Sequence, residues 1–248
     1  MKLAIYQTSD LHGFVYPTNY VTEQKLGILK IGSYILEDEK NYDASLKVDC
    51  GDLIQGSVLT NYLSRKQIKS NPIIEGLEKI NYDAYVLGNH EFNYGLDYLT
   101  NSYKHISDKV INSNIKGLPF DTKPYKIFDF NGFKIGCIGI TTSFIPNWEN
   151  ENNIKNIEFL TPVDMYEKYE NELKEKADLI IGIYHGGFEK SLDEKMILTE
   201  SLHKENQGSE LLEKFDSIDI ILSGHQHRSF ITKVNGVICS QPLNNGQT

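Results

Sequence analysis

Five short segments of the chain carry the residues that could perform chemistry. They are Asp10-Leu11-His12, Gly51-Asp52, Gly88-Asn89-His90-Glu91, Tyr184-His185-Gly186 and Gly224-His225-Gln226-His227, and each follows an apolar run. Their donor atoms are carboxylate oxygen, amide oxygen and imidazole nitrogen, a set that suits Mn, Fe, Zn or Co and lacks the thiolates of a structural zinc site. A carboxylate between two such clusters can bridge two ions about 3.5–4 Å apart, the geometry that hydrolyses phosphate esters. We therefore predict a site for two divalent metal ions and leave their identity open.

Each of these residues also has an ordinary structural interpretation. Asp52 and Asn89 adjoin glycines and could simply be turn residues, which Asp and Asn commonly are. His12 alone would more often be a partly buried histidine than a ligand. Five histidines that follow predicted strands in one order favour the metal site over this interpretation. His105 and His203 match no motif, and we expect them on the surface.

The elements that must position these residues alternate between strand and helix. Strands are predicted at residues 2–9, 46–50, 84–87, 110–112, 179–184 and 218–222, and helices at 27–40, 57–66, 72–80, 96–106, 162–176 and 209–215. Two Asn-Gly pairs, at residues 131–132 and 235–236, predict hairpins between strands 125–130 and 133–140 and between strands 230–234 and 237–240. The alternation predicts a largely parallel sheet covered by helices, and the hairpins make a second sheet mixed. Ligand loops at the carboxyl ends of strands agree with the rule for open α/β sheets.

Two polar segments connect these elements. Residues 147–156 are rich in Asn and are predicted to form a surface loop. Residues 191–207 follow His185 and lack clean periodicity. A segment that covers the site and an ordinary connection are both open interpretations of residues 191–207.

The bulk composition limits the partners. The chain has 248 residues, 40% hydrophobic and 24% charged, enough for one large domain or two small ones with a full core. The formal charge is −9 and no block of five basic residues occurs, so neither a nucleic acid polymer nor an anionic membrane is expected as a partner. A small anion can still be a ligand of this acidic protein, because two divalent ions would bring four positive charges to the site. The sequence carries no signal for an oligomeric state.

Cysteine usage and the chain start bear on localisation. Cys50, Cys137 and Cys239 lie in or beside apolar strands, which predicts buried free thiols rather than a disulfide framework. The chain opens directly on a strand pattern, and no apolar run approaches the roughly 20 residues that span a bilayer. We expect a cytoplasmic protein from the sequence as given. A chain trimmed of its export signal would look the same, so an exported or cell-wall form stays open.

In their order, the five segments resemble the motifs of the calcineurin-like metallophosphoesterases. The local sequences at residues 7–13 (QTSDLHG), 88–96 (GNHEFNYGL) and 184–189 (YHGGFE) are similar to those of the 5′-nucleotidase and 2′,3′-cyclic-nucleotide 2′-phosphodiesterase branch. The resemblance covers residues 2–247 and implies a sandwich of two mixed β-sheets flanked by helices, an α/β/β/α arrangement. It also implies that residues 1–248 are one catalytic domain and that the C-terminal nucleotide-specificity domain of the family is absent from this chain.

The resemblance assigns roles residue by residue. The first metal would be held by Asp10, His12, Asp52 and His227. The second would be held by Asp52, Asn89, His185 and His225, so that Asp52 bridges the two ions. His90 would not be a ligand, and would stabilise or protonate the leaving oxygen of the phosphate ester. Apart from the resemblance, we expect Glu91 to support its neighbours rather than to bind a metal.

Two departures from the family pattern affect the expected substrate. Many similar 5′-nucleotidases place an Asp three residues after the catalytic His, and this chain has Asn93 there. An amide can orient the imidazole but cannot stabilise imidazolium as a carboxylate does. Asn93 looks like the 2′,3′-cyclic phosphodiesterase and 3′-nucleotidase members. The second departure is that the aromatic clamp for the base belongs to the absent domain, and nothing in the sequence replaces it.

The resulting hypothesis is a dinuclear metal-dependent phosphoesterase that hydrolyses nucleotides, with 2′,3′-cyclic nucleotide phosphodiesterase and 3′-nucleotidase activity. One alternative is a 5′-nucleotidase or a broad phosphomonoesterase. The other is a non-catalytic metal-holding module that needs a partner domain.

Overall fold

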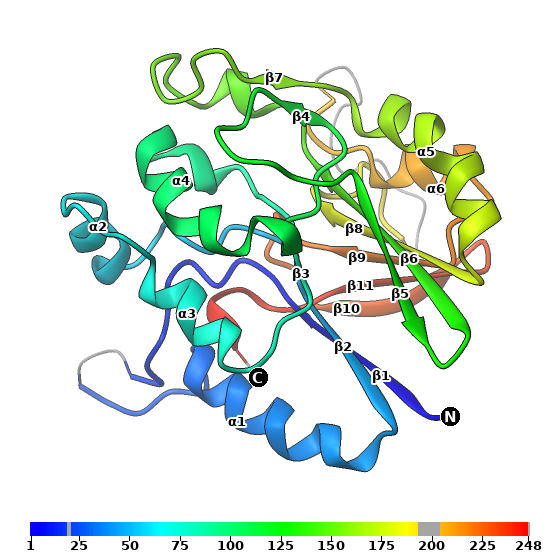
Figure 1. Ribbon diagram of the computed structural model, residues 1–248, viewed down its shortest axis with the longest axis horizontal. Coiled ribbons are helices and arrows are strands. Elements are labelled where there is room, and N and C mark those ends of the chain that lie inside the picture. The colour runs from blue at the N-terminus through cyan, green and yellow to red at the C-terminus, as the bar shows by residue number, and fades with distance from the viewer. Residues whose placement is uncertain (19–20, 193–203, 248) are drawn as a thin grey trace.

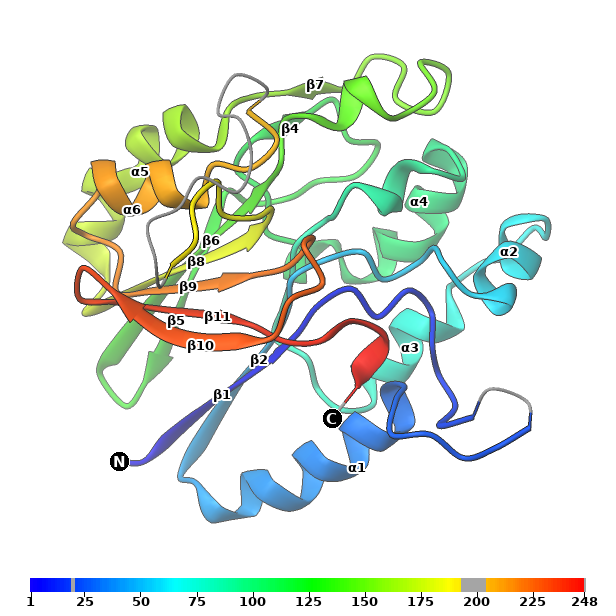
Figure 2. The same ribbon diagram turned by 180° about the vertical axis from the view of Figure 1, so that it is seen from behind.

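The computed structural model describes residues 1–18, 21–192 and 204–247 (Figure 1). His203 and residues 193–203 of the 191–207 segment lie outside the described residues. The described chain forms four layers, with two β-sheets face to face and helices on both outer faces, as Figures 1 and 2 show from opposite sides. The expected α/β/β/α arrangement is confirmed. Within the described part of the chain, no helix has the length and apolar character needed to cross a membrane.

The two sheets differ in how their strands pair. Among the described residues, the smaller sheet contains β1 (Leu3–Thr8), β2 (Ala44–Asp49) and β3 (Ala84–Tyr85) in that order, all parallel. The larger sheet has the order β10 (Phe230–Val234), β11 (Val237–Gln241), β9 (Ile220–Ser223), β8 (Leu179–His185), β6 (Phe133–Thr141) and β5 (Tyr125–Phe130). Only the larger sheet is mixed, because both predicted hairpins belong to it. Asn131 and Asn235 have φ of 55° and 51°, as hairpin turns of this kind require.

Some of the helices begin where a side chain caps their first turn. The α-helices are α1 (Ile28–Asp38), α2 (Val58–Ser64), α3 (Pro72–Glu78), α4 (Leu96–Tyr103), α5 (Pro162–Lys176) and α6 (Gly208–Lys214). Short 3-10 helices are η1 (Glu39–Asn41), η2 (His90–Phe92), η3 (Lys104–Lys109), η4 (Ile145–Asn147) and η6 (Asn244–Gly246). The Asn71 side chain accepts a hydrogen bond from the Ile73 N–H ahead of α3, and the Thr161 side chain accepts one from the Asp164 N–H ahead of α5. A proline occupies the first turn of α3 and of α5, where its missing N–H costs nothing.

The core has three parts that follow the two-residue alternation of the strands. Between the sheets, Leu46 and Val48 of β2 pack with Ile181 and Ile183 of β8. The outer face of the smaller sheet is covered by α1, α3 and α4, and the outer face of the larger sheet by α5 and α6. The three cysteines are buried and free, as predicted: Cys50, Cys137 and Cys239.

Two local features differ from the sequence prediction. Residues 110–112 form isolated bridges through Val110 and Ile111 instead of a strand. A two-stranded antiparallel pair of β4 (Ile115–Lys116) and β7 (Glu158–Phe159) was not predicted. Both strands of this pair are two residues long, too short for an alternating pattern to be visible in the sequence.

Candidate metal centre

The five predicted segments converge at the carboxyl ends of parallel strands from both sheets. Asp10, Asp52 and Asn89 lie in the loops after β1, β2 and β3. His185 is the last residue of β8, and the loop after β9 carries His225. The face-to-face arrangement of the sheets therefore brings the ends of five strands to one place, which no single sheet would do.

Five of the side chains at this place come from backbone in the left-handed region. The positive φ values are 52° at Asp10, 49° at His12, 58° at Asp52, 79° at His225 and 52° at His227. Such a conformation is costly for a residue with a Cβ and persists only where surrounding contacts fix it. Here the Asp10 N–H donates to the Gly51 carbonyl at 2.8 Å, and the His12 N–H donates to the Asp52 carbonyl at 2.9 Å. Strain of this kind concentrates at functional sites.

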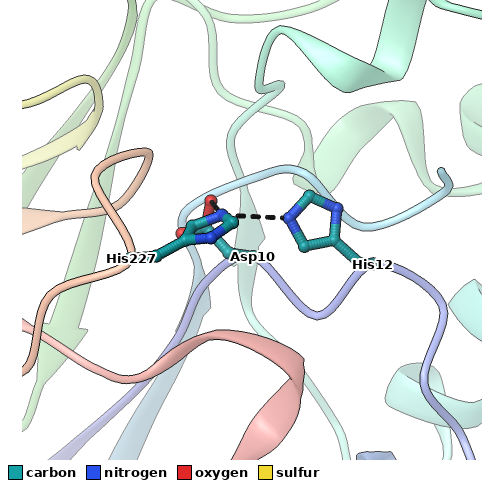
Figure 3. Close-up of side chains that lie close together, drawn as sticks. All are labelled: Asp10, His12 and His227. Atoms are coloured by element: carbon teal, nitrogen blue, oxygen red, sulfur yellow. Dashed lines mark hydrogen bonds and ion pairs between the residues drawn. The ribbon is translucent and has the colours of Figure 1, made fainter. Parts of the chain in front are cut away.

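The first donor group comprises Asp10, His12 and His227 (Figure 3). The Nε2 atoms of His12 and His227 lie 3.1 Å apart, and His227 Nε2 lies 3.2 Å from Asp10 Oδ1. The His225 N–H donates to both Asp10 oxygens, at 3.0 and 3.2 Å. One nitrogen from each imidazole and one oxygen from the carboxylate thus face a common point.

The second donor group comprises Asp52, His185 and His225, and the Asn89 amide joins it. His185 Nε2 lies 3.3 Å from Asp52 Oδ2. The Asn89 Oδ1 atom lies 3.0 Å from His185 Nε2 and 3.0 Å from His225 Nδ1. All seven residues predicted as ligands therefore lie at this one centre. Asp52 belongs to the second donor group, and its bridging role stays a prediction.

Backbone carbonyls determine which imidazole nitrogen is available to a metal. His12 Nδ1 donates to the Gln55 carbonyl at 2.8 Å, and His185 Nδ1 donates to the Cys50 carbonyl at 2.7 Å. A carbonyl can only accept, so each Nδ1 carries a proton and each Nε2 is left to face the centre. Histidines held through Nδ1 in this way present Nε2 to a metal and are typical metal ligands.

The electrostatics of the centre fit a divalent cation. Burial raises the pKa of Asp52, but the facing His185 has the larger effect, so the pKa of Asp52 lies below its usual range. Burial also raises the pKa of Asp10, and the hydrogen bond with His227 helps to bring it below its usual range. The hydrogen bond to Asp10 raises the pKa of His227. Burial lowers the pKa of His185, and the Asp52 charge more than compensates and raises it. In the absence of a metal ion, protons on the histidines therefore balance the negative charge of the buried carboxylates. The donor types suit Mn, Fe, Zn or Co.

Glu91 fixes the loop that carries Asp52. Its buried carboxylate accepts hydrogen bonds from the N–H groups of Asp52 at 2.8 Å, Leu53 at 2.6 Å, Ile54 at 3.2 Å and Gly88 at 2.6 Å. Burial and the Asp52 charge raise the pKa of Glu91. Glu91 belongs to neither donor group, consistent with the supporting role expected for it.

His90 stands beside the donor groups without belonging to either. Its N–H donates to Asp52 Oδ1 at 2.8 Å, and its Nε2 lies 3.9 Å from Asp52 Oδ2. The predicted contact with Asn93 is present, with His90 Nδ1 and Asn93 Oδ1 2.6 Å apart. Of the other two histidines, His105 is exposed as predicted, and His203 lies outside the described residues.

The sequence interpretation missed several residues at the centre. Glu205 Oε1 lies 3.1 Å from His225 Nε2, on the opposite side of that ring from Asn89. The segment predicted as a surface loop, residues 147–156, contacts the site: Asn93 Nδ2 donates to Glu149 Oε2 at 2.5 Å. A pocket of about 330 Å³ opens here, lined by Asn89, His90, Asn93, Ile145, Trp148, Glu149 and His225. No local pattern marks residues 148 and 149, because their partners lie far away in the sequence.

Comparison with known proteins agrees with this geometry. The family described as calcineurin-like phosphoesterase matches residues 3–229. The chain belongs to the calcineurin-like phosphoesterase family. Members typically bind divalent metals, and the two donor groups lie inside the matched region.

Similar phosphoesterases within this family include proteins that act on nucleotides. The trifunctional nucleotide phosphoesterase YfkN of Bacillus subtilis is 32% identical over 93% of this chain and 17% of its own length. The 2′,3′-cyclic-nucleotide 2′-phosphodiesterase/3′-nucleotidase of Haemophilus influenzae is 32% identical over 94% of this chain and 37% of its own length. A solved Staphylococcus aureus protein, provisionally assigned as a 5′-nucleotidase, has a TM-score of 0.92 at 36% identity, covering 99% of this chain and 49% of that one. The chain therefore spans less than half the length of these relatives.

Proposed function

We propose that this chain hydrolyses phosphate esters of nucleotides with two divalent metal ions, and that its substrates are 2′,3′-cyclic nucleotides and 3′-nucleotides. The observation that carries the proposal is the pair of donor groups at strand ends with His90 beside them. Relatives named as 2′,3′-cyclic-nucleotide 2′-phosphodiesterase/3′-nucleotidase match nearly all of this chain and support the same conclusion.

We assign the metal ligands from the two donor groups, with Asp52 as a ligand shared by both ions. Asp10, His12, Asp52 and His227 would hold one ion. Asp52, Asn89, His185 and His225 would hold the other. When bound, two such ions act as Lewis acids on the phosphoryl oxygens and lower the pKa of a water. Because most of these ligands are neutral, a centre holding two divalent ions would be net positive and would attract an anionic phosphate to an acidic protein.

His90 is the proposed proton donor to the leaving sugar oxygen. Its Nδ1 is engaged by Asn93 at 2.6 Å, so Nε2 is the nitrogen turned toward Asp52 and the centre. An imidazole positioned for proton transfer contributes typically about 10²–10⁴-fold to turnover. Because His90 belongs to neither donor group, we assign it to proton transfer rather than to binding a metal.

The pocket beside His90 is the proposed seat of the nucleoside. Trp148 contributes to its wall with 45% of its surface exposed, and its ring centroid lies 5.5 Å from that of His225. A nucleobase can stack on an exposed indole with little dependence on base identity, because every base has a π-face. This surface would seat the base within the catalytic domain itself.

A 5′-nucleotidase is the second candidate, favoured by the Staphylococcus aureus neighbour at 36% identity. Steady-state kinetics with 2′,3′-cyclic AMP, 3′-AMP and 5′-AMP, together with metal analysis, separates the candidates. The proposal expects about two ions per chain and the highest kcat/KM for the cyclic nucleotide. A preference for 5′-AMP would favour the second candidate. Metal binding with no hydrolysis of any ester would instead identify a metal-holding module that needs a partner domain.

A further inference from the structure

We propose that Glu149 is a positioning residue: its carboxylate fixes the orientation of the Asn93 amide and, through it, the ring of His90. The inference that this matters for turnover rests on the proposed function, whereas the inference about the ring stands on geometry alone. The three side chains form a line, with His90 Nδ1 2.6 Å from Asn93 Oδ1 and Asn93 Nδ2 2.5 Å from Glu149 Oε2.

The chemistry of the groups gives this line a direction. A carboxylate can only accept, so the amide must turn its NH₂ group toward Glu149. The amide oxygen is then left facing His90, whose Nδ1 must donate and carry a proton. With the opposite amide orientation, an oxygen would face the Glu149 carboxylate and an NH₂ group would face His90. Glu149 therefore selects between two amide orientations that have nearly the same shape.

Glu149 is itself held in place by its own loop. Its Oε1 atom accepts hydrogen bonds from the Asn150 N–H at 2.7 Å and from Asn153 Nδ2 at 2.9 Å. Asn153 Nδ2 also donates to the Asn93 backbone carbonyl at 3.0 Å. The loop therefore hydrogen-bonds both the backbone and the side-chain amide of Asn93. The negative charge thus lies one hydrogen bond further from His90 than a carboxylate at position 93 would place it.

Exchange of the two groups gives a sharp test. In Asn93→Asp alone, two carboxylates would face each other across a 2.5 Å contact, which displaces one of them. In Glu149→Gln alone, the second amide can present either end, so the orientation of Asn93 is no longer forced. In the double variant Asn93→Asp/Glu149→Gln, the introduced amide at position 149 donates to the introduced carboxylate at position 93. That carboxylate accepts from His90, and the direction of the line is restored.

The expected kinetics follow from that pattern. With a cyclic nucleotide, each single variant should lower kcat by about tenfold or more, as loss of a group that orients an active-site side chain typically does, and the change in kcat should exceed any change in KM. The double variant should return to within about threefold of the starting kcat, which independent sites would not do. Glu151→Gln, an exposed residue of the same loop, is the matched control and should leave kcat unchanged.

A second readout needs neither metal nor turnover. NMR spectra of metal-free protein labelled with ¹⁵N-histidine provide this readout, and the signals that disappear in His90→Asn belong to His90. The neutral form of the His90 ring should be the Nδ1–H tautomer. Glu149→Gln should shift the ring toward a mixture of tautomers, and the double variant should restore the Nδ1–H form. The proposal would be overturned if Glu149→Gln changed neither the tautomer nor kcat. It would also be overturned if the double variant restored neither kcat nor the Nδ1–H tautomer relative to the single variants. If the starting protein hydrolyses no ester, the proposed function fails, and the tautomer still decides the role of Glu149.

Discussion

The Nε2 atoms of His12 and His227 face each other at 3.1 Å. The Gln55 carbonyl occupies His12 Nδ1, and Asp10 lies 3.2 Å from His227 Nε2. Because His12 Nδ1 carries the proton, His12 Nε2 has a lone pair and can accept a hydrogen bond from His227 Nε2–H in the metal-free protein. The hydrogen bond to Asp10 raises the pKa of His227.

Metal binding should therefore release protons and strengthen as pH rises. The pKa values of His227 and His185 are raised in the metal-free protein, so both ions compete with protons below those values. Each released proton changes the apparent affinity by about tenfold per pH unit. Calorimetric titration with Mn²⁺ in buffers of different ionisation enthalpy measures the number released. A buffer-independent binding enthalpy would contradict the competition.

Substitutions should separate metal binding from proton transfer. His90→Asn should keep the metal content and lower kcat by about 10²–10⁴-fold, the range for a lost general acid. Asp52→Asn should lose metal and activity together, because Asp52 is the proposed bridging ligand. Metal analysis alongside single-turnover rates distinguishes the two. Loss of metal in His90→Asn would show that this imidazole is a ligand.

Gly88 leaves room for the Asp52 carboxylate. A Cβ added at Gly88 would lie 2.3 Å from Asp52 Oδ1, closer than atoms can approach. Gly88→Ala should therefore displace Asp52 and reduce metal occupancy to well below half, although the change adds one methyl group. Gly76→Ala in α3 is the control, since its nearest neighbour would be Ile28 at 3.8 Å. We expect Gly76→Ala to keep full metal occupancy and to gain about 0.5–1 kcal/mol of stability.

A buried acid should make the stability of the metal-free protein depend on pH. Burial raises the pKa of Asp49 to about 8. The folded state then holds a proton that the unfolded state releases above about pH 4, so stability falls as pH rises toward 8, at up to about 1.4 kcal/mol per pH unit. Asp49→Asn imitates the protonated acid and should remove this slope. Urea unfolding at about pH 5, 6.5 and 8 measures it, and parallel slopes for the two proteins would contradict the assignment.

The sequence was informative where the signal is local. Asn131-Gly132 marks a hairpin because the turn conformation needs those residues, and Pro72 marks a helix start for the same kind of reason. The positive φ of Asp10 has no such signal, because contacts with a neighbouring loop impose it. The contact between Asn93 and Glu149 joins residues 56 positions apart, so a pattern along the chain could show only a polar loop.

The proposed substrate preference rests on Asn93 and Trp148 together. Asn93 places no charge directly on His90, so an unstrained monoester such as 5′-AMP should suffer more than a cyclic phosphate, whose ring strain already lowers the barrier. We expect kcat/KM for 2′,3′-cyclic nucleotides to exceed that for 5′-nucleotides. The A, C, G and U substrates should agree within about tenfold, or about 1.4 kcal/mol, because stacking on an indole tolerates every base.

Trp148 is the one tryptophan of the chain, so its fluorescence reports on the pocket directly. Binding of a nucleotide to metal-free protein should quench it, whereas the methyl riboside 2′,3′-cyclic phosphate, which lacks a base, should not. Trp148→Ala should raise KM for cyclic nucleotides by about fivefold or more, since a stacked base contributes about 1–3 kcal/mol, and should leave KM for the base-free ester unchanged. An equal rise for both esters would mean that Trp148 supports the loop and His225 instead of binding the base. A strong preference among the four bases would contradict stacking as the source of affinity.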